Sequence, residues 1–530
     1  MASEIQQESC ADNSAEMDSG AFSLLELAEI LDQHKIWVES GGESGTKADF
    51  CGVDLANADL TGVNLQGAHL HKANLRNSDL SLANLRGASL VRADLRDANL
   101  LGTELRGANL MGANLYGSEG LWVGRLGGTN LFDAILPESI STFDSSTAIA
   151  QATKIARWFY FALLAISAAC WVLIALTTDP RLMLNASAIP IPRLGNVLPM
   201  AGFYLGGPLL LLLLYCRFHF LLLRLCGNMA ALPAVFPDGQ TLEKDGAWFL
   251  MGLVRRHFRW SGDNRSPLSL LETGLSALLA YWIVPATLLL FWARYLVRQD
   301  LRGTMLQVML AIAAIAGATC LPAIVSRVLR QGDLHRTKSK SALRIAASTL
   351  RSTAAAGLIL SLLSYGVIRG IPADRSIAPE VASTDIRRWA SQALQAVGCR
   401  PYADLAEASL SSTPARGNLS EEALAAVQGA RLNQMNLRYA RAYRAILVNA
   451  RLWRADLEGA YLSEADLRGA NLREAVLHSS TLDRVQASHA IMVSADGGGA
   501  NFSAADLRGA DLSYGIFENA IFSNAKLNGA

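Results

Sequence analysis

Charged side chains are scarce in this chain of 530 residues. Asp, Glu, Lys and Arg together make up 18% of it, against roughly 25% in soluble domains, so long apolar runs are expected and a purely soluble globular protein is not. An excess of one sign is missing as well, since 47 Lys and Arg face 46 Asp and Glu. This balance argues against a nucleic-acid binder driven by bulk charge and against an acidic mimic of DNA.

Paired cysteines and a leader peptide are also missing. The seven cysteines are scattered and form no CxxC pair, which predicts neither a disulfide framework nor a zinc site. Residues 1–21 form a polar N-terminal tail that lacks the basic and apolar regions of a signal peptide. We therefore expect the N-terminal part of the chain to stay on the cytoplasmic side of a membrane.

What the chain has instead is a repeat of five residues. From Phe50 to Leu115 a Leu or Phe recurs at every fifth position, 14 times in succession. A second register runs from Leu432 to Leu527 over 20 positions, most of them Leu or Phe. Ala often stands two places before each of these positions, and Asp or Asn one place before. Period five fits neither a helix nor a plain strand, and a sustained short period predicts a stacked solenoid.

The unit A-[DN]-L-x-x resembles that of the pentapeptide-repeat family. The resemblance implies a right-handed quadrilateral β-helix in which four units make one coil, and in which the central Leu or Phe and the small residue before it point inward. We expect two such β-helices, at residues 43–137 and 429–530, on either side of an α-helical transmembrane domain at residues 138–370. Their predicted core includes Leu60, Leu75, Leu85, Leu95, Leu110, Leu457, Leu467, Leu472, Leu507 and Leu512.

Short helices are predicted next to both blocks. Ser23 and Glu26 form a capping box ahead of an apolar helix face, and two glycines follow, so residues 22–42 are expected to be a helix that caps the first block. Residues 371–428 are predicted to be a linker that holds a partial coil, at Leu405 and Leu410, and a short helix after Ser420.

Five apolar runs between the blocks are long enough, or nearly so, to span a membrane. They lie at about residues 158–177, 197–216, 274–293, 304–325 and 352–368. The connections 217–273 and 326–351 carry seven Lys and Arg each, against two and three in the other two. The excess predicts that these two connections are cytoplasmic. Five spans would put the first block in the cytoplasm and the second block on the opposite side, whereas four spans would put both blocks inside.

The membrane region is similar to that of a bacterial group of pentapeptide-repeat membrane proteins. The strings that carry the similarity are TTDPRLMLN, GFYLGGPLLLLLLY, LPAVFPDG, WFLMGLVRRHF and WIVPATLLLFWARYL. This resemblance implies a multi-pass protein of the bacterial inner membrane and no particular activity.

Residues that could carry chemistry are few. His69 and His71 could suggest a metal pair, but both occupy outward slots of the repeat and are better explained as solvated histidines. The outward arginines of the first block, such as Arg86 and Arg96, could bind phosphate, but neighbouring acids nearly cancel their charge. Ionisable residues are missing from the interiors of the five apolar runs, where transporters usually place them. We therefore predict no enzyme, no cofactor and no metal.

By elimination, the sequence favours a membrane-anchored scaffold whose β-helices bind an unknown protein partner, with the lipid bilayer as the other partner. A membrane transporter or channel accessory with repeat domains is the alternative. A gyrase-protecting mimic of DNA comes third, because the repeat blocks carry net charges of −2 and +1. In the last coil, Tyr514, Ile516 and Ile521 put apolar side chains in outward slots. We expect them to form an interaction surface through which the C-terminal coils of two copies pair.

Overall fold

The computed structural model describes residues 24–140, 145–184, 188–191, 195–200, 202–239, 267–331, 339–369, 392–394, 396, 399, 401–411 and 421–530. The predicted tail 1–21, Ser23, Ser420 and most of the predicted linker lie outside these ranges. The chain divides into two compact units. Unit 1 comprises residues 1–162, 216–282 and 319–346, and unit 2 comprises residues 163–215, 283–318 and 347–530.

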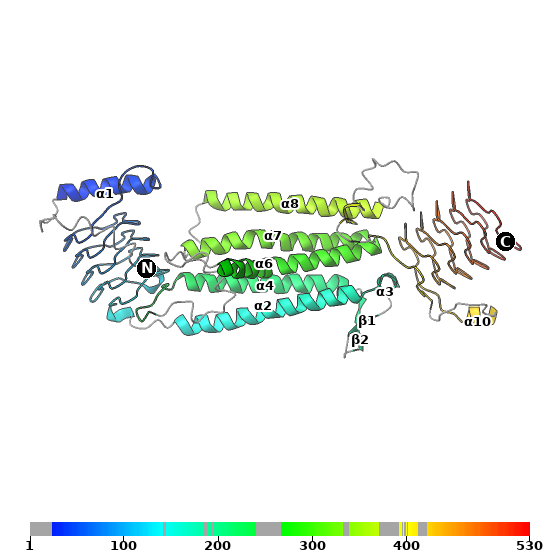
Figure 1. The fold of residues 1–530 in the computed structure, drawn as a ribbon, viewed down its shortest axis with the longest axis horizontal. Coiled ribbons are helices and arrows are strands. Elements are labelled where there is room, and N and C mark those ends of the chain that lie inside the picture. The colour runs from blue at the N-terminus through cyan, green and yellow to red at the C-terminus, as the bar shows by residue number, and fades with distance from the viewer. Residues whose placement is uncertain are drawn as a thin grey trace. The chain divides into compact units, whose positions relative to one another are not determined.

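Helices and stacked coils make up both units (Figure 1). The α-helices are α1 (Leu24–Glu39), α2 (Ser145–Leu176), α3 (Asp179–Leu184), α4 (Gly207–Ala230), α6 (Pro267–Tyr295), α7 (Leu301–Gln331), α8 (Ser339–Arg369) and α10 (Glu421–Ala425). Shorter turns of helix are η2 (Val123–Arg125), η3 (Glu138–Ile140), η4 (Gly202–Gly206) and η5 (Leu296–Arg298). Strands β1 (Ala188–Ile191) and β2 (Gly195–Pro199) form an antiparallel pair in unit 2.

The repeat blocks are stacks of coils joined by backbone hydrogen bonds. Parallel bridges connect positions 20 residues apart, as in Asn64 with Asn84 and Asn84 with Glu104. The N–H of Leu85 donates to the carbonyl of Glu104 at 2.8 Å, and the same bond recurs along both blocks. Each bridge involves a single residue, and the described residues of the blocks contain no longer strand. A right-handed quadrilateral β-helix therefore stays a prediction, while the 20-residue coil is observed.

The inside of each stack is formed by the central residue of each unit and the small residue two places before it. Nine of the ten predicted core leucines are at most 3% exposed, and alanines such as Ala83 and Ala465 are fully buried beside them. Leu512 differs, because it is partly exposed and packs at the edge of the core. It lies in the last coil, and within the described residues this coil stacks on another coil on one side only.

Corners of the coil have a left-handed backbone. The residue two places after each central position has a positive φ along nearly all of both blocks, as at Asn57 (60°), Leu82 (57°) and Arg454 (54°). A left-handed conformation costs a non-glycine residue about 1–2 kcal/mol, which explains why Gly and Asn are frequent at these corners. The Asp or Asn before the central residue offsets part of the cost. Its side-chain oxygen accepts the N–H two residues on, as Asp79 does from Ser81 at 2.8 Å.

Five of the described helices are long and apolar enough to cross a membrane. They are Gln151–Leu176, Gly202–Ala230, Gly274–Arg298, Leu301–Val328 and Thr349–Ile368. The second extends well beyond the predicted run at residues 197–216, because Arg217 and Arg224 interrupt the apolar run without interrupting the helix. The described residues between the two repeat blocks therefore include five apolar helices, an arrangement compatible with a multi-pass membrane protein.

The last coil of the N-terminal block is completed by a distant segment of unit 1. Residues 231–239, which follow α4, pair with it through a parallel bridge between Asn130 and Val235. The N–H of Gly128 donates to the carbonyl of Leu232 at 2.8 Å, and the N–H of Leu131 donates to the carbonyl of Val235 at 3.0 Å. The loop after α4 thus covers a coil edge that would otherwise be open.

Candidate interaction surfaces and polar sites

Helix α1 covers the first coil of the N-terminal block. His34 is buried and its Nδ1 accepts the N–H of Ala48 at 3.1 Å, while its ring stacks on Trp37 at 5.6 Å between centroids. Lys47 lies over the same indole at 5.8 Å and its Nζ is 3.0 Å from Nε2 of His69. Sequence reasoning predicted the helix but missed His34, although a histidine on the apolar side of a capping helix was a visible signal.

His69 and His71 lie where the repeat register places them, in outward slots. Burial, followed by the charge of Lys47, lowers the pKa of His69 below its ordinary value. Burial and two nearby cations do the same for His71. A lowered pKa keeps both imidazoles neutral near pH 7. Among the described residues, no group of three or more His, Cys, Asp and Glu gathers as metal ligands would.

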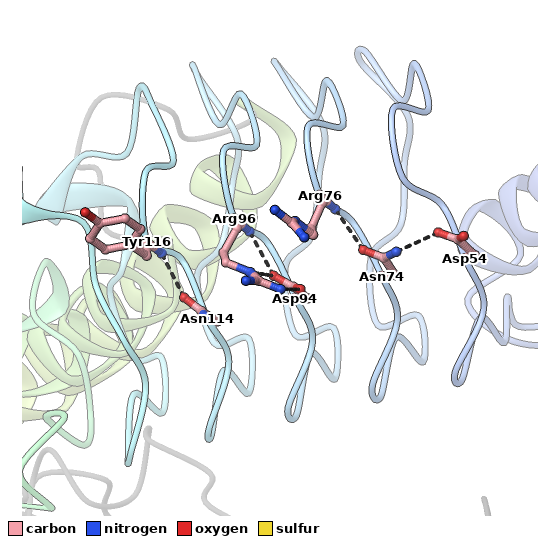
Figure 2. A network of polar contacts seen from close by, with 7 residues as sticks. All are labelled: Asp54, Asn74, Arg76, Asp94, Arg96, Asn114 and Tyr116. Carbon is pink, nitrogen blue, oxygen red and sulfur yellow. Dashed lines mark hydrogen bonds and ion pairs between the residues drawn. The ribbon is translucent and has the colours of Figure 1, made fainter.

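Arg76 and Arg96 of the N-terminal block lie along one column of Asp and Asn side chains (Figure 2). Arg96 Nε donates to Asp94 Oδ1 at 2.8 Å. Hydrogen bonding from the Arg96 side chain lowers the pKa of the Asp94 carboxyl. One coil away, Asn74 Nδ2 donates to Asp54 Oδ1 at 2.8 Å. Because Arg96 is held by the carboxylate beside it, it has little capacity left for a phosphate, and this face has mixed charge.

In the C-terminal block, arginines lie over aromatic rings and pair with glutamates of the next coil. Arg444 lies 5.0 Å from the ring of Tyr443 and pairs with Glu464 at 2.7 Å. Arg454 repeats the arrangement half a coil further along, with Trp453 at 4.7 Å and Glu474 at 2.5 Å. The side chains of Arg444 and Arg454 stay about half exposed, so each ion pair contributes little to stability.

The predicted surface in the last coil is exposed. Tyr514 is 89% exposed, Ile516 56% and Ile521 49%. Beside them, Leu512, Leu527 and their neighbours line an open hollow of about 640 Å³.

Polar groups also lie inside the apolar helices, although the interiors of the five predicted runs contain no ionisable residue. His219 is 2% exposed in α4 and packs against Tyr281 of α6, with 5.3 Å between ring centroids. It escaped prediction because it lies beyond the predicted run that ends at residue 216. Gln307, in α7, donates to the carbonyl of Tyr204.

In unit 2, the helices are joined to the first coil of the C-terminal block. Asp179, at the start of α3, pairs with Arg294 of α6 at 2.5 Å and accepts the N–H of Asp404 at 2.7 Å. Arg294 also donates to the carbonyl of Thr177 at 2.5 Å. The apolar cores meet here too, because Leu405 belongs to one cluster with aromatic residues of the helices. We call this arrangement the Asp179 junction.

Comparison with known proteins identifies the repeats. The family model described as pentapeptide repeats matches eight copies, at residues 46–81, 78–117, 455–492 and 500–530. No curated protein matches the chain.

Several solved structures of pentapeptide-repeat proteins are similar to parts of the chain. Rfr23 from the cyanobacterium Cyanothece 51142 is 27% identical over 19% of this chain, with a TM-score of 0.14, and the chain spans 65% of its length. The protein alr5209 from Nostoc PCC 7120 is 28% identical over 22% of this chain and 89% of its own, with a TM-score of 0.14. HetL from the same Nostoc strain is 14% identical over 95% of this chain and 94% of its own, with a TM-score of 0.15. The family match shows that both blocks are built of pentapeptide repeats.

Proposed function

We propose that the protein is a membrane-anchored scaffold whose two repeat blocks are right-handed quadrilateral β-helices that present rigid surfaces to protein partners. The Asp179 junction is the observation that carries the proposal. A block whose backbone is hydrogen-bonded to the side chains of Asp179 and Gln299, and whose apolar core continues into that of the helices, is held rigidly by them. Rigid attachment is what a scaffold needs, since a partner bound to the block is then fixed relative to the membrane.

The surface at Tyr514, Ile516 and Ile521 is the proposed contact, with a second copy of the chain as its first candidate partner. A Tyr514→Cys variant of the full chain, carrying a photoactivated crosslinker, should give an adduct in solubilised membranes. Adding Ile516→Lys and Ile521→Lys should abolish the adduct, because a charged side chain is costly to desolvate at a contact. The adduct's mass distinguishes a second copy from another protein. An adduct that survives the double substitution would contradict this surface, and solute flux through the pure protein in liposomes would favour the transporter alternative.

We further propose that the five apolar helices span the bacterial inner membrane, with the N-terminal block in the cytoplasm and the C-terminal block on the opposite side. The charge asymmetry of the connections supports this orientation. Contacts within each unit agree with it. The N-terminal block bonds to the segment that follows the C-terminal end of α4, whereas the C-terminal block bonds to residues that follow the C-terminal ends of α2 and α6.

Thiol labelling tests the orientation. In a chain without its own cysteines, Tyr514→Cys and Leu82→Cys place single thiols at sites that are 89% and 70% exposed. A membrane-impermeant maleimide that reaches the periplasm should label Tyr514→Cys in intact cells and Leu82→Cys only after lysis. Labelling of Leu82→Cys alone would reverse the orientation. If neither variant reacts before lysis, both blocks are cytoplasmic and four helices span.

A further inference from the structure

In the first two coils of the C-terminal block, arginines outnumber acids. Residues 401–411 and 423–455 contain six arginines, no Lys and two acids, Asp404 and Glu407. From Asp456 onward the balance reverses, with ten acids against four arginines and Lys526. The excess of positive charge is therefore confined to the coils next to the Asp179 junction.

Three of the six arginines form ion pairs with glutamates of the next coil. Arg438 pairs with Glu458 at 2.7 Å, and Arg444 and Arg454 pair with Glu464 and Glu474. These pairs leave three arginines to account for the excess of charge.

Arg431, Arg441 and Arg451 are exposed, and within the described part of the chain they form no ion pair. We call them the base arginines. Arg431 and Arg451 are stacked in one column through a parallel bridge. Arg441 stands ten residues from each, half a coil away, beside Asp404 of the first coil. The base arginines thus face different sides of the block. Helix α10 leaves them uncovered, because its contact with the block is at Ile446 and Val448.

The position of these coils relative to the helix ends sets the depth of the base arginines. Asp404, in the first coil, bonds to Asp179, which lies three residues beyond the apolar helix that ends at Leu176. Gln299, one residue beyond the apolar helix that ends at Arg298, donates to the carbonyl of Arg438 at 3.4 Å. Coils stack at about 4.8 Å, so two coils reach roughly 10 Å from the helix ends. The polar layer on each side of a bilayer is about 5–8 Å thick, so Arg431, in the first coil, lies within this layer, and Arg441 and Arg451, in the second coil, lie at its outer edge.

We propose that the base arginines bind the phosphates of anionic phospholipid headgroups and thereby hold the C-terminal block against the membrane surface. This inference rests on the membrane placement proposed above. Guanidinium groups match phosphate oxygens in a two-point geometry, and each basic residue near an anionic surface strengthens binding by about 1 kcal/mol. Trp453 and Tyr443 lie in the same two coils, as aromatic residues do at membrane interfaces. Charge on several sides of the block suits a planar layer of headgroups better than it suits a single acidic protein surface.

Lipid titration of the full chain in detergent tests the proposal. Native mass spectrometry should show that phosphatidylglycerol binds Arg431→Gln/Arg441→Gln/Arg451→Gln at least about tenfold more weakly than the parent chain. Binding of phosphatidylcholine should not change. The matched control, Arg473→Gln/Arg484→Gln/Arg508→Gln, removes three exposed charges from coils further from the junction and should keep the parent's affinity.

Equal affinity for phosphatidylglycerol in the two triple variants would overturn the proposal. Displacement of the lipid by inorganic phosphate at millimolar concentration would overturn it too, since that result indicates a site for free phosphate. Alkaline washing of native membranes tests the placement separately. Parent and variants should stay in the pellet, and release of the parent chain would refute the membrane placement whatever the lipid titration shows.

Discussion

Leu472→Asp should unfold the coils around it, whereas Arg473→Asp, one residue on, should leave them folded. Leu472 is fully buried among the leucines and alanines of the stack, while the side chain of Arg473 is 57% exposed. An aspartate in place of Leu472 would bury a charge with no partner, at a cost of about 4 kcal/mol or more. The change at Arg473 breaks an ion pair with Glu474, but that pair is long, at 3.7 Å, and exposed to solvent, so the change should cost under about 1 kcal/mol.

Limited proteolysis of the full chain in detergent measures the difference. The Leu472→Asp chain should be cut within the neighbouring coils at protease concentrations that leave the parent and Arg473→Asp intact there. Arg468, next to the core Leu467, would be a poorer control. Its guanidinium holds Asp466 at two points, 2.8 and 2.7 Å, so Arg468→Asp would set two carboxylates side by side. Equal cutting of Leu472→Asp and Arg473→Asp would contradict the inward and outward assignment of the repeat.

The coils could be predicted from the sequence because their information is local. Each unit of five residues carries its own inward Leu, its small residue and its Asp or Asn, so the register persists without help from distant segments. The role of the Asp or Asn, by contrast, needed the structure. A side-chain oxygen that accepts the N–H two residues on stabilises a left-handed corner, and the period alone says nothing about the sign of φ.

Contacts between distant segments could not be predicted from the sequence. Residues 231–239 complete a coil whose partner Asn130 lies about a hundred residues earlier, and no repeat of Leu marks that segment. The apolar runs predicted helices but placed their ends poorly, as at α4, because an arginine ends a hydrophobic run without ending hydrogen bonding along the helix. His219 was missed for the same reason. The role of Asp179 could not be predicted either, because its partners Arg294 and the N–H of Asp404 lie far away in the sequence.

Asp179→Ala should loosen the C-terminal block from the helices. The side chains of Asp179 and Arg294 are only 14% and 21% exposed, so removal of the carboxylate leaves a poorly solvated guanidinium and an N–H of Asp404 without its acceptor. Breaking a buried pair costs about 3–5 kcal/mol. Because this pair is partly exposed, about 2–3 kcal/mol is expected once solvent screening is allowed for. Asp179→Asn should cost less, since the amide oxygen can still accept from Asp404.

Hydrogen exchange on the full chain in detergent locates the effect. Amides in residues 401–411 should exchange fastest in Asp179→Ala and at an intermediate rate in Asp179→Asn, while the coils around Leu507 should keep the parent's protection. Asp506→Ala is the matched control, because it breaks the Asp506–Arg508 pair, of similar length at 2.7 Å but with the arginine 57% exposed. That change should cost under about 1 kcal/mol and leave residues 401–411 unaffected. Unchanged exchange there in Asp179→Ala would mean that the apolar contacts alone hold the block, and the Asp179 junction would then lose its part in the scaffold.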